Sequence, residues 1–146
     1  MPGKSWVRGL TIIIAVLLAA GLLGACRAVP KKPVVAPRSE IIEQRFGIRV
    51  TQIGVTADSG LLDFRYIVLD SEKALNMLEN EQTVPILVDE FTGAAVRSQV
   101  PMAHRHDLRL GETYFILFYN PQGTVKPGSL VGVHIGDLTL DHVMAQ

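Results

Sequence analysis

Residues 61–68 read LLDFRYIV, and this stretch has the clearest strand pattern in the chain. Apolar side chains occupy the even positions from Leu62 to Val68, and the charged residues Asp63 and Arg65 lie between them. Successive side chains of a strand point to opposite faces of a sheet, so one face of this strand is apolar and the other is polar. The stretch therefore predicts a half-buried strand that packs on an apolar core.

The residues before this strand predict a helix and a hairpin partner. Ser39 can cap a short helix that Gly47 can end. The alternation of apolar residues in 48–55 changes phase, which indicates a bulge near 51–52. The turn residues at 57–60, Ala-Asp-Ser-Gly, then connect this strand to the next. We expect residues 48–68 to form an antiparallel hairpin.

A second short helix is expected after the hairpin. Asp70 is a suitable N-cap for residues 71–80. Ala74, Leu75 and Leu78 form one apolar stripe in that helix. We expect this stripe to face the core.

Short strand patterns fill most of the remaining chain. We expect strands at 84–88, 94–100, 107–110, 114–119, 130–135 and 138–143, and Pro85 indicates that the first of these is an edge strand or that a strand starts there. The run at 114–119 is apolar on both faces, which is typical of a central strand. The pattern predicts a mainly β fold, an antiparallel immunoglobulin-like sandwich of about seven strands with one or two short helices, after an N-terminal signal helix. The same strand count also allows a small barrel.

The charge of the chain is unevenly distributed. Its 146 residues contain 14 basic and 14 acidic side chains, for a formal net charge of zero. All of the acidic residues fall in 39–146, which carries eight basic residues and a net charge of −6. Residues 27–38 contain three prolines and four basic residues, which is typical of an extended spacer. This division predicts a basic tether and an acidic domain, and no basic, aromatic-rich patch indicates nucleic-acid binding.

The N-terminal residues have the organisation of a signal peptide. Lys4 and Arg8 precede residues 10–26, of which 14 of 17 are apolar and none is charged. A helix of this length spans about 25 Å, which is short of the roughly 30 Å hydrocarbon core. The segment ends in Leu23-Gly24-Ala25-Cys26, which resembles the lipobox of bacterial lipoproteins.

The lipobox resemblance implies how the chain is processed and where it resides. Cleavage would fall between Ala25 and Cys26, so that residues 1–25 are removed and a diacylglyceryl group is attached to the Cys26 sulfur. Several acyl chains on one residue give stable membrane anchoring. In this family an Asp after the cysteine retains the protein in the inner membrane, and Arg27 is not Asp. The resemblance therefore implies a lipoprotein with a tether at 26–38 and a domain at 39–146, on the periplasmic side of the outer membrane.

Histidine and methionine residues near the C-terminal end form a candidate metal site. Met102, His104 and His106 face one way along an extended strand, and so do His142 and Met144. Thioether and imidazole ligands together favour copper, particularly Cu(I). The His-x-Met pair resembles part of the motif of periplasmic copper chaperones, although the second pair of that family is absent. The alternative is that these side chains are ordinary surface and strand residues.

Catalytic motifs are not evident in the sequence. It contains no G-x-S-x-G elbow, no H-E-x-x-H motif and no phosphate-binding glycine loop, and the resemblance assigns its single cysteine to lipid. We therefore expect a non-catalytic interaction or structural role in the envelope, with an unidentified protein partner, and copper binding is the alternative. The loops at 92–105 and 120–128 are the first candidates for partner contact. The second of these also resembles segments of envelope lipoproteins with no assigned activity.

Overall fold

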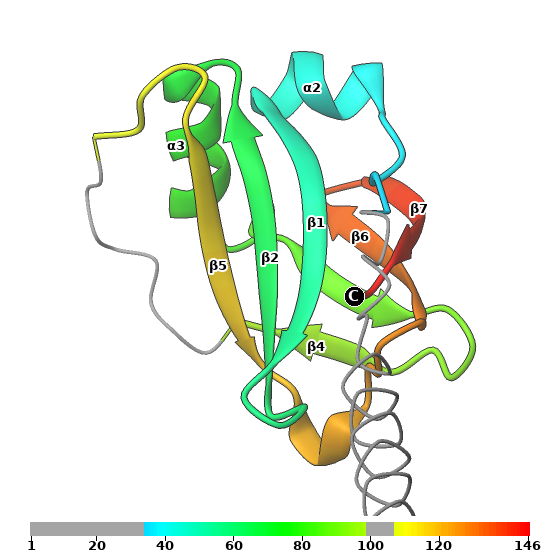
Figure 1. Cartoon of the computed structure of the whole chain (residues 1–146). Helices are drawn as coiled ribbons and strands as arrows, with labels where there is room; N and C mark the ends of the chain where they lie inside the picture. The colour runs from blue at the N-terminus through cyan, green and yellow to red at the C-terminus, as the bar shows by residue number, and fades with distance from the viewer. Residues whose placement is uncertain (1–33, 99–106) are drawn as a thin grey trace, which may run out of the picture. The chain divides into compact units, whose positions relative to one another are not determined.

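The computed structural model describes residues 34–98 and 107–146, and seven strands and two α-helices lie in these ranges (Figure 1). In chain order they are α2 (Glu40–Phe46), β1 (Ile48–Thr56), β2 (Leu61–Val68), α3 (Ser71–Glu79), β3 (Ile86–Asp89), β4 (Ala95–Arg97), β5 (Thr113–Tyr119), the 3₁₀ turn η1 (Pro121–Gly123), β6 (Leu130–Ile135) and β7 (Leu138–Met144). These elements belong to one compact unit, Val34–Gln146. No helix in the described ranges is long and apolar enough to span a membrane.

The strands form two antiparallel sheets with the order β1-β2-β5 and β4-β3-β6-β7. Immunoglobulin-like sandwiches likewise place strands 1, 2 and 5 in one sheet and strands 3, 6 and 7 in the other. Here the fourth strand extends the second sheet. Figure 1 shows that β3 and β4 cross behind the β1-β2-β5 sheet. The predicted antiparallel β-sandwich is therefore confirmed.

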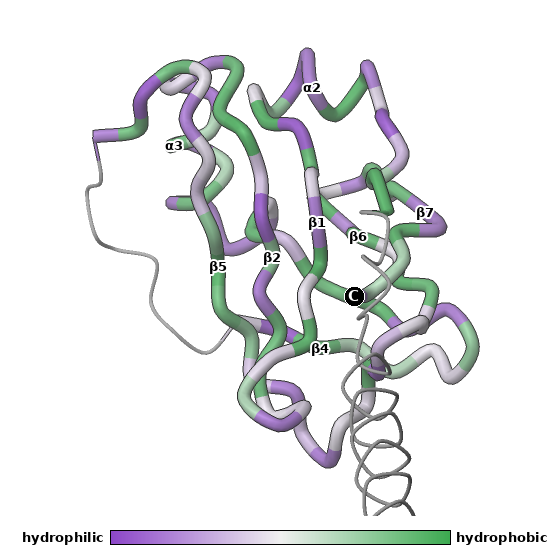
Figure 2. The backbone as a smooth tube through the Cα atoms, viewed as in Figure 1, coloured by the Kyte–Doolittle hydropathy of each residue, from purple (hydrophilic) through white to green (hydrophobic). Residues whose placement is uncertain are grey.

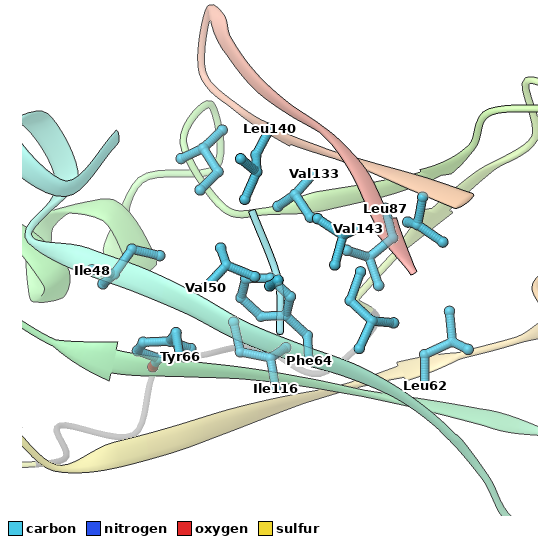
Figure 3. Close-up of a cluster of buried hydrophobic side chains, with 14 of the residues drawn as sticks. Ile48, Val50, Leu62, Phe64, Tyr66, Leu87, Ile116, Val133, Leu140 and Val143 are labelled. Carbon is cyan, nitrogen blue, oxygen red and sulfur yellow. The ribbon is translucent and has the colours of Figure 1, made fainter. Parts of the chain in front are cut away.

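The core lies between the two sheets (Figure 3). The predicted alternation along β2 is confirmed, because Leu62, Phe64 and Val68 are fully buried, and Figure 2 shows hydrophilic residues between the hydrophobic ones. The ring of Phe64 packs edge-on against Phe118 of β5, with centroids 6.2 Å apart. From the second sheet, buried side chains come from every strand, namely Leu87, Val96, Val131, Val133, Ile135, Leu140 and Val143.

Both helices begin as their capping residues predict. Ser39 Oγ accepts a hydrogen bond from the backbone N–H of Ile42, and Gly47 ends α2 in the left-handed region at φ 64°. Asp70 caps α3 in the same way. The buried face of α3 differs from the prediction, because Ala74 and Met77 are buried. Leu75 and Leu78 are half-buried, since the flexible thioether three residues after Ala74 fills the core position instead.

Three strand predictions are wrong in detail. The run at 114–119 is not a central strand, because β5 lies at the edge of its sheet. Residues 107–110 form a loop whose backbone is bound by Tyr114 Oη, which donates to Asp107 O and accepts from Arg109 N–H. The third strand begins at Ile86 and not at residue 84, because the proline before it has no N–H for the ladder.

An ion cluster ties the segment before α2 to the first sheet. Both carboxylate oxygens of Glu43 accept hydrogen bonds from the guanidinium groups of Arg49, at 2.8 and 2.9 Å, and of Arg38, at 3.0 and 3.1 Å. These bonds lower the pKa of Glu43 to about 2. Gln146 Nε2 also donates to the carbonyl of Val34, and Ala36 is buried. The residues just before Ser39 therefore pack on the sandwich.

Replacement of Glu43 by glutamine is expected to lower the free energy of unfolding of residues 34–146 by about 1–2 kcal/mol at pH 7, since the ion pairs are partly exposed and screened. Because the folded-state pKa lies below the unfolded one, the carboxylate stabilises the fold above about pH 4.5. That stabilisation is lost as the pH falls toward 2. Urea unfolding at pH 7 and pH 2.5 measures the difference, and Glu79→Gln on exposed α3 is the control. A deficit of Glu43→Gln that is equal at both pH values would contradict this assignment.

Candidate functional site

The outer face of the β1-β2-β5 sheet carries a row of exposed apolar side chains. Phe115, Leu117 and Tyr119 alternate along β5 and are 63%, 39% and 55% exposed. The residues between them, Ile116 and Phe118, are buried in the core. Large exposed apolar side chains in one row mark interaction surfaces more often than single ones do. We call these three residues the β5 stripe.

The charges beside the β5 stripe neutralise each other. In the β2–β5 register Phe115 lies opposite Arg65, and Leu117 lies opposite Asp63. Arg65 Nε donates to Asp63 Oδ2 at 2.7 Å, and this hydrogen bond raises the pKa of Arg65. A partner that covers the stripe therefore meets an ion pair that is already formed, and it does not need to supply a counter-charge.

An open hollow of about 540 Å³ continues this face at one end of the sandwich. It joins the stripe through Tyr119, and the β1–β2 turn and the loop after β5 form its walls. The polar side chains that line it include Asp58, Ser59, Gln122 and Lys126. The loop at 120–128, predicted from the sequence as a contact loop, thus borders this hollow.

Asn120 holds the two walls of the hollow together. Its side chain is buried, and Nδ2 donates to the carbonyls of Ser59 and Val125, both at 2.8 Å. Asn120 Oδ1 accepts from the backbone N–H of Val125 at 3.0 Å. Residues 57–59 and Gln122 all have positive φ without being glycine, so strained backbone is concentrated here. Asn120 therefore connects the β1–β2 turn to the loop after β5 through three hydrogen bonds.

The other sheet presents a histidine that is positioned by a carboxylate. His142 lies in a β7 bulge at φ 63°, where the β6–β7 register shifts opposite Gly132. Glu90 accepts from the His142 backbone N–H at 2.5 Å and contacts its Nδ1 at 2.8 Å. These bonds, the backbone one first, lower the pKa of Glu90. The arrangement leaves the ring 75% exposed on the outer face of this sheet.

The structure describes only part of the predicted metal set. His142 and Met144 both lie on β7 and are exposed, whereas Met102, His104 and His106 lie outside the described residues, as does Cys26. Within the ranges 34–98 and 107–146, no group of three or more His, Cys, Asp or Glu side chains is placed to hold a metal ion. Copper binding by the five residues stays a prediction.

Sequence reasoning missed the β5 stripe and the Glu90–His142 pair. The signal for the stripe is present in the sequence, because 114–119 is apolar on both faces. A central strand and an edge strand with one exposed apolar face share this pattern. The contact between Glu90 and His142 joins residues 52 positions apart across β6, and no local pattern predicts it.

Comparison of the chain with protein-family models, curated proteins and solved structures finds no match. The class of protein is therefore defined by the fold and its surface alone. It is a two-sheet antiparallel β-sandwich with short helices and an exposed apolar row on one outer sheet face.

Proposed function

We propose that this protein is a lipid-anchored, non-catalytic binding module of a bacterial envelope, most consistent with the periplasmic side of the outer membrane. The observation that carries the binding role is the β5 stripe, Phe115, Leu117 and Tyr119. Aromatic residues and arginine are enriched in protein interfaces, and Arg65 lies directly beside Phe115. The stripe with its neutral ion pair suits a protein surface of largely apolar character.

The anchoring part of the proposal derives from the sequence. Lys4 and Arg8, the uncharged apolar segment and the single cysteine at position 26 support export and lipid attachment. The mature chain would then begin with the lipid-bearing Cys26, followed by the Pro-rich basic tether. Its residues Lys31 and Lys32 would lie near the lipid surface, where each adds about 1 kcal/mol of attraction to anionic head groups. The domain would thus be held close to the membrane.

The first measurement tests the anchor. Cells that express the full chain are labelled with a palmitate analogue, and the wild type is compared with Cys26→Ala. We expect the wild type to carry the label and the variant to lose it and to migrate as the uncleaved precursor, because position 26 supplies the only thiol. Ser39→Ala, in the same chain, is the processing control. A labelled Cys26→Ala chain would contradict the anchor.

The second measurement tests the binding role in the same cells. Intact cells are treated with a photo-activated crosslinker that does not require amine groups. The crosslinked peptides are then identified and located in the chain. We expect crosslinks to another polypeptide chain to concentrate on β5 and to be rare on the outer face of β7. Crosslinks that lie only around His142 would assign the interaction to the other sheet. Absence of crosslinked peptides from both faces would contradict a binding module.

A further inference from the structure

Three of the four sheet edges carry features that oppose pairing with another strand. The edge strand β1 is bulged near Thr51, and the C-terminal residue Gln146 exchanges backbone hydrogen bonds with Ile53 and Val55. The edge strand β4 has only three residues and ends in Arg97. The edge strand β7 is bulged at His142. Bulges, short length and charged residues are the usual means by which proteins protect sheet edges.

Among the described residues, none of these features is found at the fourth edge, β5. Its sequence, TYFILFY, contains no charged residue, proline or glycine, and its register with β2 runs through seven pairs without a shift. The bonds Val68 N–H to Glu112 O and Asn120 N–H to Gly60 O fix which residues pair with β2. By the alternation of an antiparallel ladder, the N–H and C=O groups of Thr113, Phe115, Leu117 and Tyr119 point away from β2.

One contact confirms the direction of this backbone. Ser98 Oγ donates to the carbonyl of Leu117 at 3.4 Å, from the side opposite to β2. A carbonyl oxygen has two lone pairs, so this long bond leaves room for a second donor. The edge of β5 thus combines outward backbone groups with the exposed apolar side chains of the same residues.

We propose that β5 pairs with β5 of a second copy of this chain, antiparallel about a two-fold axis at Ile116, to form a continuous six-stranded sheet. This inference rests on the proposed function and names the partner for the β5 stripe. In this register Phe115 lies opposite Leu117 of the second copy, and Thr113 lies opposite Tyr119. Aromatic and aliphatic side chains thus meet across the axis, as stable cross-strand pairs do.

Charge favours a second copy over a charged partner strand. A charged residue opposite β5 would lose water without gaining a counter-charge, since the strand itself is neutral. The charged residues opposite it in the β2 register, Arg65 and Asp63, already pair with each other. A second copy presents the same neutral strand, so a two-fold contact between the two β5 strands leaves no charge without a partner. One strand pair buries less than the roughly 1,600 Å² of a standard interface, so the dimer depends on concentration at the membrane.

The test uses the full chain in cells that express two differently tagged copies. A photo-reactive benzoylphenylalanine replaces Tyr119 of β5, and the control position is Phe91, which is 98% exposed in the β3–β4 turn. We expect irradiation at position 119 to yield a species that carries both tags, and irradiation at position 91 to yield none. Crosslinks from position 119 to a different protein would overturn the second copy as the partner and leave the proposed binding function intact. No crosslink from position 119 would overturn the pairing.

Charge variants then test the register. Leu117→Lys in both copies is expected to lower the doubly tagged species at least about tenfold, equivalent to about 1.4 kcal/mol. Leu130→Lys, at an exposed leucine of β6, is the matched control and should leave it unchanged. A Leu117→Lys copy together with a Phe115→Glu copy should restore the crosslink, because these positions face each other in the proposed register. An unchanged yield in Leu117→Lys would overturn the strand pairing.

Discussion

Replacement of Gly47 by alanine is expected to lower the free energy of unfolding by about 3–5 kcal/mol, because two costs act at one residue. Gly47 has φ 64°, where a side chain costs about 1–2 kcal/mol. A Cβ added there would also lie 2.6 Å from the carbonyl oxygen of Asp70 and 2.7 Å from its Cβ. Neither group can move easily, since Gly47 O accepts hydrogen bonds from the N–H groups of Leu69 and Asp70.

A variant at Gly111 distinguishes the cost of a side chain at positive φ from the cost of the steric contact. It has φ 80°, and among the described residues no heavy atom lies within 4 Å of an added Cβ. Gly111→Ala should therefore lose only the backbone cost of about 1–2 kcal/mol. Urea unfolding of residues 34–146 at pH 7 measures both variants against the wild type. Equal losses in the two variants would show that the contact between the end of α2 and the start of α3 relaxes to admit a methyl group.

Replacement of Asn120 by aspartate is expected to cost about 3–4 kcal/mol at pH 7, although the two side chains have nearly the same shape. The amide group that donates to Ser59 O and Val125 O becomes a carboxylate oxygen that faces both carbonyls. Only the bond from Val125 N–H to Oδ1 would remain. Asn120→Ala loses all three bonds but buries no charge, and we expect a smaller loss of about 2–3 kcal/mol.

The pH dependence distinguishes charge from shape at this position. Burial raises the pKa of a carboxyl group, so the Asn120→Asp penalty applies where the carboxylate is charged and decreases as the pH falls. Unfolding at pH 7 and pH 4.5 measures this change, with Asn76→Asp on the exposed side of α3 as the control. We expect the control to change stability by less than about 0.5 kcal/mol. An Asn120→Asp loss that does not exceed the alanine loss at pH 7 would contradict the bonding described here.

The variants at Asn120 and Gly47 are also expected to differ in their effect on the binding surface. Asn120 connects the β1–β2 turn to the loop after β5, so its loss is expected to loosen the hollow next to Tyr119. Gly47 lies between α2 and β1, away from the β5 stripe. Asn120→Ala should therefore lower partner contact beyond its effect on stability, and Gly47→Ala should not. The crosslinking yield from β5, compared at equal folded fraction, checks this difference.

Local signals predicted much of the secondary structure correctly. Ser39 and Asp70 cap the two helices because their short side chains accept hydrogen bonds from first-turn N–H groups that have no acceptor within the helix. The phase change in β1 located the bulge beside Thr51, since a bulge moves side chains from one face of the strand to the other. The residues at 57–60 located the first hairpin for a similar local reason. Such signals involve residues close together in the chain, so the sequence contains them directly.

The position of β5 within its sheet could not be predicted from a local sequence pattern. An apolar strand can lie in the middle of a sheet or at its edge, and its neighbours are set by strands far away in the chain. In this fold β4 joins the second sheet, so β5 pairs with β2 on one side, and no strand of the described residues pairs with its other side. For the same reason the burial of Met77 in place of Leu75 could not be predicted from the helix alone.

The amino-acid sequence was sufficient to predict a mainly β fold, the start of each helix and the first and last hairpins, and the proposed lipid anchor at Cys26 rests on it alone. The three-dimensional arrangement was needed to find which apolar residues remain exposed, why Asn120 is buried and that Glu90 reaches His142. The physical reason is distance along the chain. Capping and alternation act over a few residues, whereas exposure and long-range hydrogen bonds depend on how distant strands pack. The surface proposed to bind a partner belongs to the second kind.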